Sequence, residues 1–122
     1  MFRIFYAGNV TKPEVNNDQE EIRTDHGHKL ADMRMGWKFY QERGHLLLKG
    51  SLCKTHTFVG TTDQMNKDHV FLDYQGENVD ANFSQLIREC GATHTSMSIG
   101  DVLIDSLNGD MWFCDHYGWT KI

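Results

Sequence analysis

The chain has 122 residues, a formal net charge of −5 and an apolar fraction of 39%. This length suits one domain rather than two, and the composition excludes a disordered or collagen-like chain. No stretch approaches the roughly 18 apolar residues of a membrane span, and the first apolar run is shorter than a signal-peptide core. We therefore expect a single globular domain over residues 1–122.

Charge is distributed unevenly along the chain. Residues 1–61 carry a net charge of +2, and residues 62–122 carry −7. An acidic surface repels phosphate backbones, so we expect no direct binding of nucleic acid through the second half. The same surface suits a basic partner protein, although a purely solubilising role explains it equally well.

The cysteine pattern predicts neither a disulfide framework nor a metal centre. The cysteines, each with a histidine close behind it, are Cys53 and His56, Cys90 and His94, and Cys114 and His116. Their number is odd and no C-x-x-C pair occurs, which favours a reducing cytoplasm. Zinc prefers these ligand types, but the spacing within each pair differs. We predict no metal site and no cofactor.

The first half of the chain predicts a strand, a long helix and two short strands. Alternating bulky residues predict a strand at 2–7, and a helical pattern runs from about 18 to 43. Four apolar residues form one stripe of that helix and are predicted to pack in the core: Leu30, Met33, Trp37 and Tyr40. Residues 46–49 and 53–59 are typical of two short strands.

The second half predicts two helices followed by strands. The predicted caps and ends are Thr62 or Asp63 to Tyr74 for the first helix, and Asn82 or Ser84 to Gly91 for the second. A short strand is predicted at 102–105, and a long strand, bent at Gly118, at 111–122. The pattern indicates an α+β domain with an antiparallel sheet, two or three helices and a C-terminal β-hairpin.

The most distinctive stretch is the loop at residues 94–101, with the sequence HTSMSIGD. Its three hydroxyl side chains can form local turns that hold its own backbone. The functional alternative is a contact surface formed by this loop and nearby aromatic residues. The candidate binding residues are His94, Thr95, Ser96, Met97, Ser98, Gly100, Asp101, Trp112, Tyr117 and Trp119.

The spacing of two of those aromatic residues predicts which faces of the strand they occupy. Trp112 and Trp119 lie seven positions apart. In a regular strand this odd spacing places them on opposite faces. We therefore expect at least one of the two to be exposed, unless a bulge intervenes.

A second hypothesis concerns phosphoester chemistry. The tripeptide His94-Thr95-Ser96 fits the H-x-[ST] pattern of two-histidine phosphoesterases, in which two histidines act as acid and base. The other candidate tripeptide, at residues 56–58, ends in Phe58, which cannot hydrogen-bond phosphate. The catalytic set is incomplete, so we assign no catalytic residue.

The stretch from Thr55 to Asp105 resembles small phage-encoded, YodL-like proteins. They share a strand, a helix and a [HR]-[TS]-S-M-S-x-G-D loop before a hairpin, and MWFCDHYGWTKI is similar to their aromatic closing strand. Residues 14–50 do not match and are predicted to be a helical insertion, which could contact a second copy or a partner. The resemblance implies an accessory protein of a tailed phage or mobile element, acting in the host cytoplasm, and implies no catalytic residue.

These patterns together predict a small acidic accessory protein without catalytic activity. We expect it to bind and modulate a host or phage macromolecule, with a protein as the leading candidate. One alternative is a small phosphoesterase or nucleotide-binding protein that uses His94-Thr95-Ser96. Another is a virion or assembly component, and a homodimer is compatible with each of these.

Overall fold

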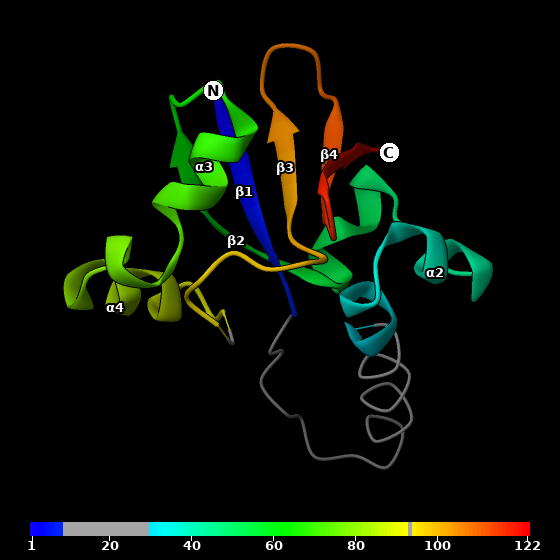
Figure 1. Ribbon diagram of the computed structural model, residues 1–122, viewed down its shortest axis with the longest axis horizontal. Helices are drawn as coiled ribbons and strands as arrows, with labels where there is room; N and C mark the ends of the chain where they lie inside the picture. Colours follow the sequence, from blue (N-terminus) through cyan, green and yellow to red (C-terminus); the bar gives the residue numbers. More distant parts are fainter. Residues whose placement is uncertain (9–29, 93) are drawn as a thin grey trace.

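The computed structural model describes residues 1–8, 30–92 and 94–122, which contain a five-stranded antiparallel sheet (Figure 1). The strands are β1 (Phe2–Ala7), β2 (His56–Thr62), β3 (Val102–Asp105), β4 (Met111–Asp115) and β5 (Gly118–Lys121). Their order in the sheet is β2-β1-β3-β4-β5, so β1 pairs with both β2 and β3. The predicted α+β class and the strands at 2–7 and 102–105 are confirmed.

Helical segments lie on both sides of this sheet. They are α2 (Trp37–Glu42), α3 (Lys67–Asp73), α4 (Ala81–Glu89), the 3₁₀ helices η1 (Lys49–Lys54) and η2 (Gly76–Asn78), and helical residues 30–34. In Figure 1, α3 and α4 lie to the left and α2 lies to the right. Because side chains alternate along a strand, those of β1 pack into two hydrophobic cores, one on each face of the sheet. Phe2, Ile4 and Tyr6 pack with α3 and α4. Ala7 packs with residues of the α2 side.

The C-terminal segment is a hairpin, so the prediction of one long strand is wrong. β4 and β5 pair antiparallel from Trp112 with Lys121 to Asp115 with Gly118. His116 and Tyr117 form the two-residue turn between them. Gly118 has a φ of +93°, a left-handed conformation that glycine adopts at low cost. The glycine that suggested a bend thus marks the start of the return strand.

This hairpin places both tryptophans on one face of the sheet. Trp112 lies on β4 and Trp119 lies on β5, and both are partly buried against the core that contains α3 and α4. The expectation of opposite faces assumed one continuous strand and is wrong. Trp119 pairs with Cys114 and so lies on the same face as Cys114. Cys114 and Trp112 are two residues apart on β4 and share that face, so the two tryptophans lie on one side of the sheet.

The middle of the chain differs from its prediction. Residues 49–54 form η1, and the strand that follows is β2, so the two predicted short strands are replaced by one. Leu46 and Leu48 are 78% and 59% exposed, as expected of residues outside a paired strand. A short apolar run cannot distinguish a strand from another buried segment by periodicity alone.

Both helices of the second half start at caps other than those predicted. Asn66 caps α3, and its side chain accepts hydrogen bonds from the amides of Asp68 and His69. Asp80 caps α4 and accepts from the amide of Phe83 at 2.8 Å. The chain has many short polar residues near each helix start, and the tertiary path decides which of them adopts the extended cap conformation.

The predicted helix at 18–43 and the insertion at 14–50 lie partly outside the described residues. Within them, the helical residues 30–34 are separated from α2 by Gly36, whose φ is +101°. Trp37 is partly buried, and its ring centroid lies 5.2 Å from that of Phe113. The apolar stripe of this segment therefore packs in the core, as predicted.

Candidate functional site

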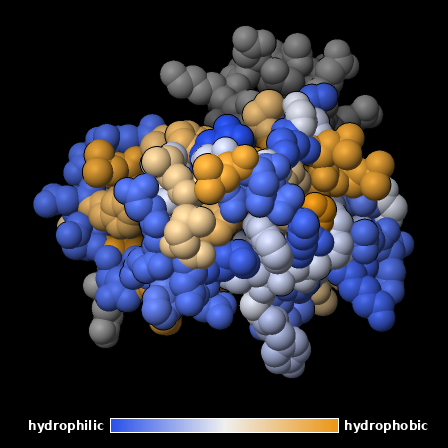
Figure 2. All heavy atoms as spheres, turned by 90° about the horizontal axis from the view of Figure 1, so that it is seen from above, coloured by the Kyte–Doolittle hydropathy of each residue, from blue (hydrophilic) through white to orange (hydrophobic). Residues whose placement is uncertain are grey.

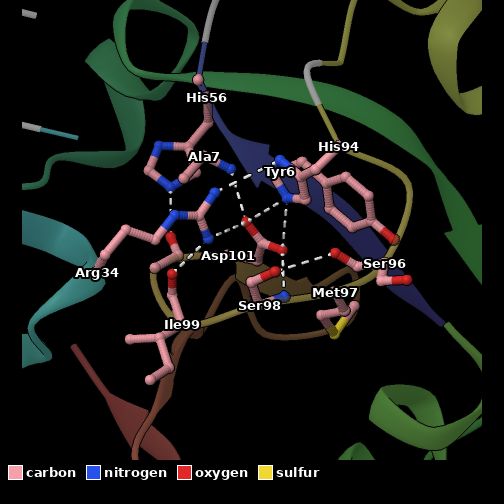
Figure 3. Close-up of polar contacts among 12 residues, drawn as sticks. Tyr6, Ala7, Arg34, His56, His94, Ser96, Met97, Ser98, Ile99 and Asp101 are labelled. Atoms are coloured by element: carbon pink, nitrogen blue, oxygen red, sulfur yellow. Dashed lines mark hydrogen bonds and ion pairs between the residues drawn. The ribbon is translucent and has the colours of Figure 1, made fainter. Parts of the chain in front are cut away.

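The loop at residues 94–101 is organised around the buried carboxylate of Asp101 (Figure 3). Its Oδ1 accepts a hydrogen bond of 2.8 Å from the Ala7 amide, and its Oδ2 accepts one of 2.7 Å from the Ser98 amide. Nε2 of His94 lies 3.0 Å from Oδ2. Nη1 of Arg34 lies 3.9 Å from Oδ1. The charge is therefore compensated by one cation and by several donors, as a buried carboxylate requires.

His94 is held on three sides. Its ring stacks on Tyr6 with centroids 4.5 Å apart and an interplanar angle of 11°. Nη2 of Arg34 lies 3.4 Å from Nδ1, and a guanidinium can only donate, so Nδ1 accepts. Nε2 therefore donates the hydrogen bond to Asp101. Both ring nitrogens are thus engaged inside the protein.

Arg34 and His56 attach the loop to the rest of the fold. Nη1 of Arg34 donates to the carbonyl of Ile99 at 2.7 Å. His56 is buried, and its Nε2 donates to the carbonyl of Gly100 at 2.7 Å. The sequence interpretation treated His56 as part of an incomplete second tripeptide and did not single out Arg34. No spacing in the sequence indicates that these residues meet the loop.

The hydroxyl groups and backbone of the loop bond partly within the loop and partly to the segment that follows α3. Oγ of Ser98 donates to the carbonyl of Ser96 at 3.1 Å, and Oγ of Ser96 accepts from the Gly76 amide at 3.3 Å. Met97 is buried, and its amide donates to the carbonyl of Tyr74 at 3.0 Å. Ser98 thus forms the local bond that the hydroxyl-rich sequence predicts, whereas Ser96 and Met97 attach the loop to the connection that follows α3.

The cluster has the residue types of an acid–base pair but not the access. Asp101 is fully buried, and both nitrogens of His94 are engaged. General acid–base chemistry needs a nitrogen or oxygen within reach of the substrate proton. As arranged, Asp101 and His94 stabilise the loop, and His94 presents no ring nitrogen to a phosphate.

The structure divides the predicted contact surface. Asp101 and Met97 are buried and line no surface. Tyr117 is fully exposed at the β4–β5 turn. Trp112 is partly buried, and Nζ of Lys67 lies 4.0 Å from its ring centroid. The loop joins the aromatic hairpin through backbone, because the Gly100 amide donates to the carbonyl of Cys114 at 2.9 Å.

A pocket lies between α3 and the β4–β5 hairpin. Its volume is about 330 Å³, at the low end of the range for small-ligand sites. The lining residues are Asp68, Phe71, Leu72, Cys114, Asp115, His116, Gly118 and Trp119. We call it the α3–hairpin pocket. Asp68, Phe71 and Leu72 share one face of α3 because they are three and four residues apart.

Sequence reasoning named only part of this pocket. Trp119 was among the candidate binding residues, whereas Phe71 and Leu72 were simply assigned to a helix. The helical spacing indicates that Asp68, Phe71 and Leu72 share a face. Nothing in the sequence shows that this face lies opposite the hairpin.

Asp68 and Asp115 both belong to the pocket lining, but the Asp115 carboxylate lies on the α2 side of the sheet, where a Cβ added to Gly36 would lie 2.9 Å from its Oδ1. Asp115 accepts hydrogen bonds from the His116 amide at 2.9 Å and from Oγ1 of Thr120 at 2.8 Å. Asp68 stands exposed in the first turn of α3. Within residues 1–8, 30–92 and 94–122, neither aspartate forms an ion pair. The pocket therefore combines an apolar lining with one exposed carboxylate at its edge, that of Asp68.

Cys114 lines the pocket as a neutral group. Burial raises the pKa of its thiol to about 12, and the carboxylates of Asp101 and Asp115 act in the same direction. The thiolate is the nucleophilic form of cysteine. At neutral pH Cys114 is therefore a small apolar part of the lining.

The cysteine–histidine pairs do not converge. Cys53 and Cys90 are exposed, whereas Cys114 is buried. In the described parts of the chain, no three side chains of His, Cys, Asp or Glu are grouped so that they could hold a metal ion. None of the helices described there has the length and apolar character needed to cross a membrane.

Comparison with protein-family models, with curated proteins and with solved structures finds no match to this chain.

Proposed function

We propose that this chain is a non-catalytic protein-binding domain and that the α3–hairpin pocket is the centre of its contact surface. The observation that carries the proposal is the pocket itself, an apolar concavity with the exposed Asp68 at its edge, which has no ion pair in the described structure. Burying an apolar centre inside a polar rim is the usual anatomy of a protein–protein interface.

Exposed apolar side chains near the pocket support the proposal. Leu72 lines the pocket and is 56% exposed, and Tyr117 stands at the turn beside its hairpin wall. Figure 2 shows apolar residues reaching the surface in patches between polar ones. Tyrosine is enriched at interfaces because it combines a large contact area with a polar end.

The acidic second half favours a basic partner. Residues 62–122 have a net charge of −7, and Asp68 at the edge of the pocket belongs to this half. Opposite charge on the partner would accelerate association and make the binding sensitive to salt. The likeness of the loop at 94–101 to YodL-like proteins supports a role as a phage or mobile-element accessory protein in the host cytoplasm.

The phosphoesterase alternative receives less support. It requires His94 to exchange a proton with a substrate, yet both nitrogens of His94 are engaged by Asp101 and Arg34. Its hydroxyl partner Ser96 accepts a hydrogen bond from the Gly76 amide. A substrate would have to displace these contacts before it met an acid or a base.

The test is affinity capture with matched charge variants. The chain is immobilised, a bacterial host lysate is passed over it, and retained proteins are identified by mass spectrometry. The Asp68→Asn variant keeps the shape of the pocket and removes the charge at its edge. The Glu89→Gln variant removes the same charge from the end of α4, outside the pocket.

We expect one stoichiometric partner that salt releases. The pocket variant should retain at least tenfold less of it, and the control variant should retain it as the unmodified chain does. A partner retained equally by all three proteins would refute the pocket as the contact. No stoichiometric partner in any host lysate would count against the binding function.

A further inference from the structure

The sheet ends on β5, and the outer edge of this strand carries backbone groups without a partner in the described structure. On β4, the Cys114 amide donates to the carbonyl of Asp101 and its carbonyl accepts from Gly100, so both groups point away from β5. Trp119 is paired with Cys114, and its own amide and carbonyl therefore point away from β4. Those of Lys121 point the same way, because backbone direction alternates along a strand. No described residue bonds to these four groups.

The opposite edge of the sheet, formed by β2, is obstructed. The register between β1 and β2 shifts at Ile4 and Phe5, which marks a bulge. Beyond the bulge, Sγ of Cys90 at the end of α4 lies 3.9 Å from the carbonyl of Val59. Bulges and covering segments are the usual means of preventing an edge strand from pairing. In the part of the chain that the structure describes, β5 is therefore the more accessible edge.

The residues of β5 are complementary to themselves. Trp119 and Lys121 share one face because they are two residues apart. A second copy, related by a two-fold axis that passes through Thr120 perpendicular to the sheet, would place each Trp119 opposite Lys121 of the other copy. Both are residues with outward backbone groups, so each pair would exchange two hydrogen bonds and the edge would form four.

Other registers are less favourable. An axis through Lys121 would place two lysines opposite one another, and like charges in that position are destabilising. An axis through Trp119 would leave Lys121 opposite Tyr117, which belongs to the turn. The register centred on Thr120 also reproduces a contact that this face of the sheet already makes, since Nζ of Lys67 lies 4.0 Å from the ring centroid of Trp112.

We propose that two copies of this chain pair antiparallel through β5, with the two-fold axis at Thr120, and so join two five-stranded sheets into one. Such an interface is isologous and closes on itself. The axis leaves both α3–hairpin pockets on the same face of the joined sheet. The dimer does not depend on the proposed protein-binding function, but it would offer two pockets to one partner.

The first experiment measures the mass of the full chain by analytical ultracentrifugation between about 5 and 500 µM. The interface is short, so we expect a dissociation constant of about 50 µM. The weight-average mass should rise from 14.1 kDa toward twice that value. Lys121→Pro removes an outward amide and the side chain that faces Trp119, and it should weaken dimerisation at least tenfold. An outward proline is tolerated on an edge strand, and circular dichroism checks that the variant is folded.

The matched control is Thr61→Pro on the opposite edge. The Met1 carbonyl accepts from the Ser106 amide on the β3 side, so Phe2 bonds to its β2 partner Thr62, and Thr61 points outward. This variant also places a proline at an outward position, but on β2. It should dimerise as the unmodified chain does.

The second experiment needs no substitution. Amide hydrogen exchange is followed by ¹H–¹⁵N NMR at about 20 and 500 µM. The amides of Trp119 and Lys121 should exchange about threefold more slowly at the higher concentration, because the monomer fraction falls by about that factor. The amide of Thr61 should exchange at the same rate at both concentrations.

A mass that stays at 14.1 kDa throughout would overturn the proposal. So would dimerisation of a folded Lys121→Pro variant at the affinity of the unmodified chain, or slower exchange at Thr61 in place of Trp119 and Lys121. If Lys121→Pro fails to fold, the exchange data decide. A partner captured by a chain that remains monomeric would support the proposed function and refute the dimer, so the two failures are distinguishable.

Discussion

Oδ2 of Asp101 lies 3.0 Å from Nε2 of His94, and the two residues are the last and the first of one eight-residue loop. The contact closes the loop across its ends, and the Ala7 amide ties the same carboxylate to the end of β1. Gly100 and Asp101 in turn pair with Cys114 through backbone hydrogen bonds of 2.9 and 2.8 Å. The buried carboxylate therefore joins the loop to β1, and the backbone of Gly100 and Asp101 joins it to β4.

This arrangement predicts that Asp101 is essential for folding stability. In Asp101→Asn, the new amide group would face amide donors, and Arg34 and His94 would lose their acceptor charge. We expect a loss of about 3 kcal/mol in the free energy of unfolding, because removing one partner of a buried charge pair leaves the others uncompensated. Urea denaturation followed by circular dichroism measures this change.

The control is Asp110→Asn, which removes a surface carboxylate paired with Lys121 at 3.3 Å. Exposed ion pairs contribute little, so we expect a change below about 1 kcal/mol. Equal effects of the two substitutions would contradict the central role of Asp101.

The helix caps are tested by two alanine substitutions on α4. Asp80→Ala removes the side chain that accepts from the Phe83 amide at 2.8 Å, so we expect a loss of about 1 kcal/mol. Asn82→Ala changes an exposed residue within the first turn, at a position the sequence suggested as the cap. We expect almost no loss there, because alanine has the higher helix propensity. If thermal or urea unfolding showed a larger loss of stability in Asn82→Ala than in Asp80→Ala, the helix cap would be Asn82, as the sequence suggested.

Gly100 is predicted to tolerate no side chain. Its φ is +100°, and an added Cβ would lie 3.1 Å from Cβ of Met33. Gly91 has a φ of +93° with nothing within 4 Å, so Gly91→Ala measures the backbone strain alone. That strain is about 1–2 kcal/mol. We expect Gly100→Ala to lower the free energy of unfolding more than Gly91→Ala does. An equal loss in the two variants would show that Met33 moves aside at little cost.

The buried thiol of Cys114 predicts a loss of stability in alkali. Its pKa is raised to about 12 from the usual 9.0, mainly by burial and further by Asp101. The unfolded chain therefore loses this proton at a lower pH than the folded chain. The stabilising contribution is complete below pH 9.0 and declines as the pH rises toward about 12. The slope between these limits is at most about 1.4 kcal/mol per pH unit.

Comparison with Cys114→Ala isolates this contribution, since burial also raises the pKa of Tyr6 and Tyr74. The free energy of unfolding of the unmodified chain should fall more steeply above pH 9 than that of the variant. Iodoacetamide provides a second measurement at pH 8. It should label exposed Cys90 in the folded chain and Cys114 only after unfolding. Parallel pH profiles or rapid labelling of Cys114 would contradict its burial.

Local patterns predicted a large part of the fold. The alternation in residues 2–7 correctly indicated β1, and the apolar stripe with Met33 and Trp37 correctly indicated core packing. The hydroxyl-rich loop was correctly expected to bond its own backbone. These features depend on residues close in sequence, so periodicity and turn chemistry suffice to find them.

Features that join distant segments were not predictable in the same way. The sequence could not show that His56 and Arg34 meet the loop at Gly100 and Ile99, or that Asp101 would be buried. A polar residue is usually exposed, and its burial costs little free energy only where tertiary contacts supply its hydrogen-bond partners. The same holds for the α3–hairpin pocket, whose two walls lie more than forty positions apart along the chain.

The sequence by itself determined the α+β class, the strands at 2–7 and 102–105, the uneven charge and the distinctive loop. The tertiary structure alone decided that Asp101 is buried beneath His94 and that both tryptophans share a face. It also decided that α3 and the hairpin enclose an apolar pocket. The physical reason is the separation along the chain over which each kind of interaction acts. Backbone propensities and side-chain alternation act over a few residues, whereas burial and charge compensation depend on which distant segments the folded chain brings together.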